Sequence, residues 1–204
     1  EGMDLAKTAP ILCAGITTFS PLRTWGVKQG TRVGVIGLGG LGHMAVKLAA
    51  AMGAEVTAIS RSNKKEAEAK AMGAKDMLVS TDEDAMKAAA NSFDLIIDTA
   101  PVKHDVGQYA PLLDIDGTIV IVGQVGPMEE LMTPPLVMGR RRVAGSLIGG
   151  IKETQEVLDF CAEHGIYPDC QMIKMDEING AFETLAKGDL AQRFVIDMAS
   201  LSAE

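Results

Sequence analysis

A glycine-rich turn between an apolar run and a helical pattern is the feature that most constrains this chain. The stretch from Arg32 to Ala54 reads RVGVIGLGGLGHMAVKLAAAMGA. Its first five residues are typical of a buried strand, and apolar residues then recur at helical spacing as far as Met52, with Gly53 at the helix end. A strand, a glycine turn and a helix in this order predict the first βα unit of a parallel sheet.

Three glycines in that turn, Gly37, Gly39 and Gly42, have G-x-G-x-x-G spacing. The first permits a tight turn, the second lets the backbone approach a pyrophosphate, and the third allows the helix to pack closely on the sheet. The helix that follows offers N–H groups and a positive dipole end to phosphates. The flanking strand and helix disfavour the alternative, a turn without a ligand. We therefore predict a dinucleotide site that includes Gly37, Leu38, Gly39, Gly40, Leu41 and Gly42.

The same alternation of strand and helix continues along the chain. Further strands are predicted at 55–59, 76–79, 94–98, 117–122 and 142–148, with helices between them at 63–72, about 80–90 and 106–113. Ser80 and Glu83 have the spacing of a capping box at the start of the helix near 80. Apolar strands alternating with amphipathic helices predict an α/β fold: a doubly wound, six-stranded parallel sheet with helices on both faces.

The two ends of the chain have other patterns. Before Arg32 the pattern is helical, with Pro10 and Pro21 as breaks. After residue 150 the expected order is helix, strand, helix, strand, at 152–163, 171–174, 176–186 and 193–197. We predict a helical connection at 1–24, a dinucleotide-binding domain at 25–149 and a portion of a second domain at 150–204. At 204 residues the chain is long for one domain and short for two, and it starts at Glu1, so we expect a piece of a longer protein.

Composition excludes several classes of function. A hydrophobic fraction of 47% and a net charge of −8 are typical of a soluble globular protein. No apolar run is long enough to cross a membrane, and no signal-peptide pattern begins the chain. An acidic chain is also a poor match for nucleic-acid phosphates. Three cysteines without a C-x-x-C pair argue against a disulfide framework and predict a reducing, cytoplasmic setting.

The end of the second predicted strand selects between NAD and NADP. It continues SRSNKK over residues 60–65, with no carboxylate where the ribose 2′-hydroxyl of NAD requires one. A hydroxyl and nearby cations suit the 2′-phosphate of NADP through charge-assisted hydrogen bonds. The alternative is a solvated basic turn, although lysine at that end of a helix opposes the helix dipole. We predict NADP(H), held by Ser60, Arg61, Ser62 and Lys65.

The glycine motif, the segment PILCAGITTFSPL at 10–22 and the ending RFVIDM at 193–198 together carry a family resemblance. The chain resembles the cofactor-binding domain and C-terminal return of the zinc-dependent medium-chain alcohol dehydrogenases, in particular the cinnamyl alcohol dehydrogenase group. The resemblance implies an oxidoreductase that transfers hydride between NADP(H) and a small alcohol or aldehyde. It also implies that an N-terminal catalytic domain is absent, so these 204 residues are expected to bind cofactor without being active.

The resemblance assigns roles to individual residues. Cys13 matches a ligand of the catalytic zinc, and Thr17, one helical turn later, matches a catalytic position beside the nicotinamide. Taken alone, a cysteine in such an apolar segment is more often a core residue. Leu41 matches the side chain behind the nicotinamide ring. The remaining cofactor positions implied by the resemblance are Val122, Gly123, Ser146, Ile148 and Arg193, the last of which would reach the cofactor phosphates.

Other histidines and cysteines have simpler interpretations. Cys161 and His164 share a predicted helix face, but two ligands without a third indicate a coincidence. We interpret His43 as a helix residue rather than a general base, and His104 and His164 as surface residues. The apolar sixth strand is expected at a sheet edge, and the resemblance implies that the edge near 143–148 pairs with a second copy in a homodimer.

Two other functions remain open. The chain could be a dinucleotide-binding module without chemistry, or part of a zinc-free reductase similar to the quinone reductases. Cys13 counts against the second alternative.

Overall fold

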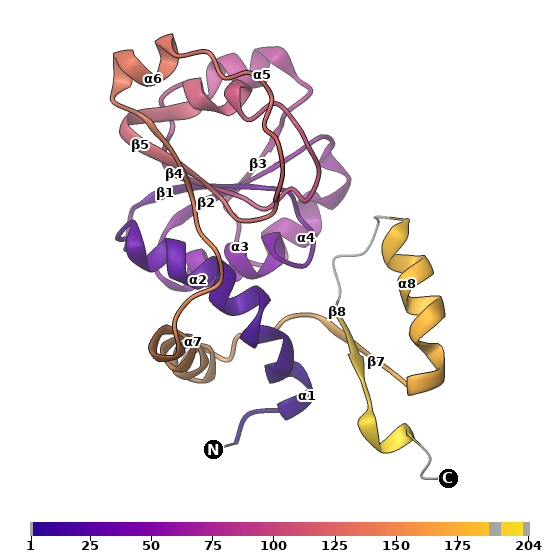
Figure 1. The fold of residues 1–204 in the computed structure, drawn as a ribbon. Coiled ribbons are helices and arrows are strands. Elements are labelled where there is room, and N and C mark those ends of the chain that lie inside the picture. Colours follow the sequence, from indigo (N-terminus) through magenta and orange to yellow (C-terminus); the bar gives the residue numbers. More distant parts are fainter. Residues whose placement is uncertain (1, 188–192, 202–204) are drawn as a thin grey trace.

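The computed structural model describes residues 2–187 and 193–201. A six-stranded sheet lies at its centre (Figure 1) and consists of β1 (Arg32–Ile36), β2 (Glu55–Ser60), β3 (Asp76–Val79), β4 (Phe93–Asp98), β5 (Leu113–Ile121) and β6 (Arg142–Gly145). The strand order is β3-β2-β1-β4-β5-β6, and every neighbouring pair is parallel. The predicted doubly wound, six-stranded parallel sheet of the Rossmann type is therefore confirmed. The strand order reverses between β1 and β4, where such sheets bind ligands beyond the carboxyl ends of their strands.

The strands are apolar on both faces because helices cover both. One core cluster contains Val35 and Ala58, and a second contains their chain neighbours Ile36 and Ile59. Because successive side chains of a strand point to opposite faces, these two clusters lie on opposite sides of the sheet. The first side is covered by α3 (Gly42–Ala51) and α4 (Glu66–Ala71), and the second by α5 (Glu83–Ala88) and the 3-10 helix η3 (Gly107–Leu112).

The N-terminal helices join the first side of this unit. They are α1 (Leu5–Thr8), the 3-10 helix η1 (Ala9–Leu12) and α2 (Ala14–Thr24). Helix α2 packs on α3 and on α7 (Ile151–His164), where the rings of Phe19 and Phe160 lie 5.7 Å apart. The prediction that Pro21 breaks a helix is wrong, since Pro21 lies inside α2. Proline removes one helical donor, but the Trp25 N–H still donates to the Pro21 carbonyl at 3.0 Å and the helix continues.

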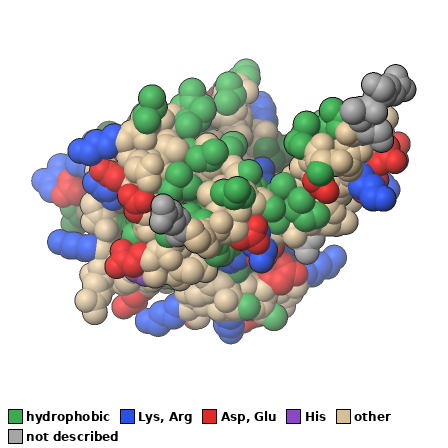
Figure 2. Space-filling model, turned by 90° about the horizontal axis from the view of Figure 1, so that it is seen from below, with side chains coloured by type: hydrophobic (Ala, Val, Ile, Leu, Met, Phe, Trp, Pro, Cys, Tyr) green, Lys and Arg blue, Asp and Glu red, His purple; other side chains and the backbone are tan. Residues whose placement is uncertain are grey.

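The C-terminal tail has the predicted order of helix, strand, helix and strand, and its part after α7 lies apart from the central sheet. Strands β7 (Cys170–Ile173) and β8 (Arg193–Ile196) make a parallel pair apart from the central sheet, beside α8 (Ile178–Ala186) (Figure 1). Short 3-10 turns, η4 (Met175–Glu177) and η5 (Met198–Ser200), follow the two strands. Figure 2 shows hydrophobic side chains on this lobe, and the exposed ones include Met172, Phe182, Leu185, Met198 and Leu201.

Several predicted boundaries are wrong. Asp82, not Ser80, caps α5, because its carboxylate accepts the N–H groups of Asp84 and Ala85 at 3.1 and 3.0 Å. The predicted helix at 63–72 begins with a 3-10 turn, η2 (Asn63–Lys65), and the one at 106–113 is the 3-10 helix η3. The last predicted strand of the sheet stops at Gly145 rather than at residue 148. Helix α6 (Pro134–Gly139) lies between the last two strands of the sheet, where no helix was predicted.

Candidate cofactor site

The glycine turn lies at the carboxyl end of β1, between the loops that follow β2 and β4. Gly37 has a φ of +84°, a left-handed conformation that favours glycine. Its N–H donates to the Ile59 carbonyl at 2.9 Å. The N–H and hydroxyl of Thr99 both donate to the Ile36 carbonyl, at 3.0 and 2.7 Å. The turn is therefore fixed from both sides by the neighbouring strands.

The other glycines of the motif serve different purposes. A Cβ atom on Gly42 would overlap the carbonyl oxygen of Gly37, so only glycine lets α3 begin so close to the strand. A Cβ on Gly39 would meet nothing within 4 Å, and the space above it is open. Leu38 is buried and Leu41 half-buried, and both pack on the core. The two leucines hold the turn in place while its glycine backbone stays accessible.

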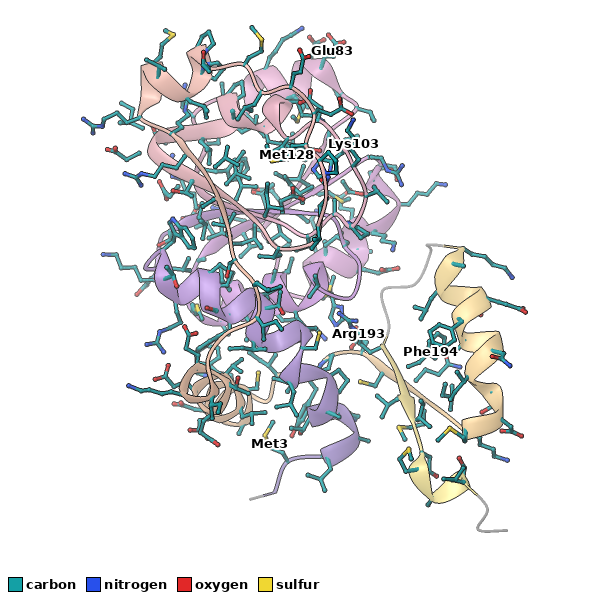
Figure 3. The ribbon with its side chains drawn as sticks, viewed as in Figure 1. Met3, Glu83, Lys103, Met128, Arg193 and Phe194 are labelled. Atoms are coloured by element: carbon teal, nitrogen blue, oxygen red, sulfur yellow. The ribbon has the colours of Figure 1, made fainter. Side chains whose placement is uncertain are left out.

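Arg193 brings the C-terminal unit onto this turn. A Cβ on Gly40 would lie 2.5–2.8 Å from the guanidinium atoms of Arg193. The Arg193 Nε is buried and, among the described residues, has no hydrogen-bond partner. In Figure 3 the Arg193 side chain lies where β8 approaches the central unit. An unpaired buried donor above an open glycine turn fits an anion such as the pyrophosphate of a dinucleotide.

The end of β2 carries the residues predicted to select NADP. Ser60, Ser62 and Lys65 are half-buried, and Arg61 is exposed. The Thr81 hydroxyl donates to the Arg61 carbonyl at 3.1 Å and so ties this segment to the end of β3. Within the described part of the chain no carboxylate lies within 4.0 Å of the charged nitrogens of Arg61 or Lys65. In a chain with a net charge of −8, cations without a partner fit the 2′-phosphate of NADP.

Sequence reasoning missed a pair of side chains at the end of β4. Asp98 is fully buried, and its Oδ2 lies 3.1 Å from Nε2 of His104. Its other oxygen accepts the Ala100 N–H at 3.1 Å. Burial raises the pKa of Asp98, and only 17% of the His104 side chain is exposed, so the prediction that His104 is a surface residue is wrong. An aspartate ending an otherwise apolar strand was the signal that could have identified this pair.

The four residues predicted near the nicotinamide follow β5 and β6 at the same carboxyl edge. The N–H groups of Val122 and Gly123 donate to the Asp98 carbonyl at 2.9 and 3.1 Å. The Ser146 N–H donates to the Ile121 carbonyl at 3.1 Å. Ile148 has a φ of +51°, a strained conformation for a β-branched residue, and it turns the chain away from the sheet. A left-handed residue cannot continue a strand, so residue 148 lies outside β6, which already ends at Gly145.

Cys13 and Thr17 lie at the start of α2. Cys13 is exposed where η1 meets α2, so it is not the core residue that its apolar neighbours suggested. Thr17 is buried, and its N–H donates to the Cys13 carbonyl at 3.0 Å. Across residues 2–187 and 193–201 there is no group of three or more metal-binding side chains. The described residues therefore offer a zinc ion the exposed thiol of Cys13 and no group of three or more ligands.

Cys161 and His164 have the surroundings of structural residues. Cys161 is buried, and this burial raises the pKa of its thiol to about 11, which disfavours the thiolate that binds metals. His164 is exposed, as predicted, and stacks on Phe160 with 4.2 Å between ring centroids. The sharing of one helix face by Cys161 and His164 is thus a packing feature.

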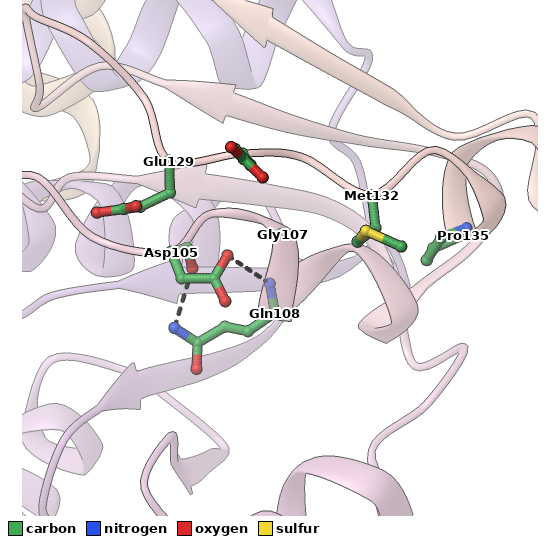
Figure 4. Close-up of a pocket in the computed structure, with 7 residues that line it drawn as sticks. Asp105, Gly107, Gln108, Glu129, Met132 and Pro135 are labelled. Atoms are coloured by element: carbon green, nitrogen blue, oxygen red, sulfur yellow. Dashed lines mark hydrogen bonds between the residues drawn. The ribbon is translucent and has the colours of Figure 1, made fainter.

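An open hollow of about 650 Å³ lies beside η3 (Figure 4). Its lining includes the carboxylates of Asp105, Glu129 and Glu130. Three acidic side chains repel phosphate, and none of the predicted cofactor residues lines the hollow. The glycine turn, not this hollow, is therefore the candidate dinucleotide site.

Comparison with known proteins places the chain in a family. The family model described as zinc-binding dehydrogenase matches residues 40–163, and the chain belongs to this family. The aldehyde reductase YahK of Escherichia coli is 51% identical over 202 residues, which are 98% of this chain and 57% of that protein. This chain thus spans little more than half the length of the curated relatives that it matches.

Two solved structures give the same result. A cinnamyl alcohol dehydrogenase from Sorghum bicolor matches with a TM-score of 0.93 and 43% identity, over 100% of this chain and 58% of that one. A cinnamyl alcohol dehydrogenase from Helicobacter pylori, described as complexed with NADP(H), matches with a TM-score of 0.84 and 42% identity, over 97% of this chain and 56% of that one. The predicted family membership is confirmed.

Among the helices of the described residues, none combines the length and the apolar character that a membrane span requires.

Proposed function

We propose that this chain is the NADP(H)-binding portion of an NADP-dependent zinc alcohol dehydrogenase or aldehyde reductase. The observation that carries the proposal is the glycine turn at the reversal of strand order, with Arg193 above Gly40. Arg61 and Lys65 at the end of β2 have no carboxylate partner among the described residues and favour the phosphorylated cofactor. The names of the relatives, an aldehyde reductase and cinnamyl alcohol dehydrogenases, support a small alcohol or aldehyde as substrate.

In this proposal each group of residues holds one part of the cofactor. The turn at 37–42 and Arg193 bind the pyrophosphate, and the side chains of Ser60, Arg61, Ser62 and Lys65 bind the 2′-phosphate. Leu41 supports the nicotinamide ring, Thr17 lies beside it, and Val122, Gly123, Ser146 and Ile148 bound the pocket for its carboxamide. The bound nicotinamide supplies or accepts the hydride.

We further propose that Cys13 is one ligand of a catalytic zinc whose other ligands lie outside the described residues. Its exposure supports this role, because a ligand must be accessible as a thiolate. In the complete protein, Cys13→Ser should lower the zinc content and the alcohol-oxidising activity together, as measured by metal analysis and steady-state assay. A zinc content unaffected by the substitution would remove Cys13 from the site.

The assignment of parts, assembly and location completes the proposal. Residues 25–149 form the dinucleotide domain, 1–24 form the helical connection that carries Cys13, and 150–204 are the C-terminal portion of the catalytic domain. The sheet edge at β6, followed by the exposed Leu147 and Ile148, supports homodimer formation near 143–148. The three cysteines without a disulfide support a cytoplasmic location.

Two alternatives differ in their use of metal. A dinucleotide-binding module without chemistry is supported by the lack of a three-ligand cluster among the described residues. A zinc-free reductase similar to the quinone reductases would leave the exposed Cys13 without a role. Metal analysis of the complete protein separates both from the main proposal.

Cofactor choice can be tested on this chain by fluorescence titration with NADPH and NADH. We expect NADPH to bind at least tenfold more tightly, which corresponds to about 1.4 kcal/mol. Arg61→Glu should weaken NADPH binding by about tenfold or more and leave NADH within about twofold, because only NADPH carries the 2′-phosphate. Lys28→Glu makes the same charge change at an exposed residue before β1 and is the control. Equal affinities of the parent chain for both cofactors would overturn the NADP assignment.

A further inference from the structure

His43 is a buried side chain that connects two distant segments. It is the second residue of α3 and is completely inaccessible to solvent. Its Nδ1 lies 3.3 Å from the carbonyl oxygen of Gly39 in the glycine turn. Its Nε2 lies 3.3 Å from the backbone nitrogen of Asp169, which is 126 residues away in the C-terminal segment. One ring nitrogen therefore faces a backbone acceptor, and the other faces a backbone donor.

These partners fix the protonation of the ring. The Asp169 N–H can only donate, so Nε2 must be the unprotonated acceptor, and Nδ1 carries the hydrogen that is donated to Gly39. Burial, assisted by the charge of Lys47, lowers the pKa of His43 to about 4, with Arg193 also lowering it and Asp169 raising it. The neutral ring is thus the form that makes both contacts at physiological pH.

Lys47 holds the same segment from one turn further along α3. Its Nζ donates to the Tyr167 carbonyl at 2.9 Å and to an Asp169 carboxylate oxygen at 3.0 Å. Residues i and i+4 of a helix lie on one face. Two side chains of α3, His43 and Lys47, therefore hold residues 167–169 by hydrogen bonds.

The segment 167–169 in turn positions Arg193. The Asp169 carbonyl accepts the Arg193 N–H at 2.8 Å, and Cys170 pairs with Arg193 at the start of the β7–β8 ladder. The Arg193 guanidinium then lies against Gly40. The contacts run from Gly39 through His43 and Asp169 to Arg193, and return to the turn at the next residue, Gly40.

We propose that His43 is a positioning residue for cofactor binding: by holding Asp169 it keeps Arg193 above the phosphate-binding turn. This inference rests on the proposed function, because the ligand is taken to be NADP(H). If His43 only filled space in the core, its substitution would act on binding independently of Arg193. Positioning instead requires that the effects of the two residues be coupled.

The first test is a double-mutant cycle on this chain, read as NADPH affinity. We expect His43→Ala and Arg193→Ala each to weaken binding by about tenfold, and the double variant to be no more than about threefold weaker than Arg193→Ala, because the two act through one contact. His164→Ala, which removes an exposed imidazole, is the control and should bind as the parent does. The proposal would be overturned if the double variant lost affinity by the product of the two single losses. It would also be overturned if His43→Ala bound NADPH within twofold of the parent.

Two conservative variants separate the contacts of the ring. A glutamine amide can replace Nε2 and keep the acceptor for Asp169, whereas an asparagine amide can replace only Nδ1 and keep the bond to Gly39. Because positioning acts through Asp169, His43→Gln should restore most of the NADPH affinity and His43→Asn should not. Equal affinities of these two variants would contradict the proposal.

Binding of adenosine 2′-monophosphate distinguishes a lost position of Arg193 from a failure of the His43 variants to fold. This probe carries the 2′-phosphate but no pyrophosphate, so the His43 variants should bind it within about twofold of the parent if they are folded. Hydrogen exchange adds a measurement without a ligand: the Asp169 amide should be protected in the parent and exchange faster in His43→Ala. If the parent bound no NADPH, the proposed function would fail, and an equally protected Asp169 amide in both chains would contradict the role of His43.

Discussion

The carboxyl edge of the central sheet and the start of α2 differ in how completely this chain builds them. At the sheet edge, the glycine turn is fixed by Ile59 in β2 and by Thr99 directly after β4, and Arg193 covers it from the C-terminal unit. At the start of α2, Cys13 is exposed, and the described residues hold no group of three or more metal-binding side chains.

This difference indicates that the two proposed sites depend on the chain in different ways. A dinucleotide can be bound by backbone groups, and the sheet positions them through its own hydrogen bonds. A zinc ion requires three or four side chains held at fixed distances, and one thiol cannot replace them. We therefore expect substitutions at the sheet edge to lower the stability of this chain or its affinity for NADPH. A substitution at Cys13 should leave both unchanged.

The largest effect is expected from Gly42→Ala. Its Cβ would overlap the Gly37 carbonyl, so the turn or the helix must move, at a cost of about 3 kcal/mol in the free energy of unfolding. Urea denaturation measures the loss. Gly126→Ala, at a position where a Cβ meets nothing within 4 Å, is the control and should unfold at the parent's urea concentration. A Gly42→Ala chain as stable as the control would show that the turn is not constrained.

The next effect is a dependence of stability on pH through His43. Its pKa is about 4 in the folded chain and near 6.5 when unfolded, so the unfolded state binds more protons between these values. The contribution to stability is complete above pH 6.5 and is lost as the pH falls towards 4, to a total of about 3 kcal/mol. Urea denaturation at pH 7 and 4.5 should show a smaller loss for His43→Gln than for the parent, whereas His164→Gln should behave as the parent does. Equal losses would place the folded pKa of His43 near its ordinary value.

Gly39→Ala should affect binding and not stability. A Cβ at this position meets nothing in the chain, but it would occupy the space proposed for the pyrophosphate. We expect the urea midpoint to stay within error and the affinity for NADPH to fall about tenfold, or about 1.4 kcal/mol. An unchanged affinity would place the cofactor away from the turn.

The smallest effect is expected from Cys13→Ser in this chain. Because Cys13 is exposed and belongs to no group of three or more metal-binding side chains among the described residues, its replacement should change stability by less than about 0.5 kcal/mol. NADPH affinity should also be unchanged. Cys161→Ser provides the contrast: it places a hydroxyl in the core and should lower the stability. A clear loss of NADPH affinity in Cys13→Ser would contradict this expectation and would show that Cys13 contributes to cofactor binding.

The features that sequence reasoning identified are those set by local pattern. The period of apolar residues located all six strands of the sheet, and the glycine spacing located the turn. The boundary errors have local causes that the pattern does not reveal: Asp82 takes the cap in place of Ser80, and Ile148 adopts a left-handed conformation beyond β6. The Asp98–His104 pair was missed because it depends on the path of a loop, which periodicity does not describe.

The sequence by itself determined the class of fold and the place of the cofactor turn, because strand period, helix period and glycine conformation act over a few neighbouring residues. Only the tertiary structure decided which distant groups meet there. Arg193 reaches Gly40 because Asp169 is held by His43 and Lys47, across more than 120 residues of chain. Such contacts follow from packing and not from spacing, and they show a side chain first interpreted as an ordinary helix residue to be a link between the two units.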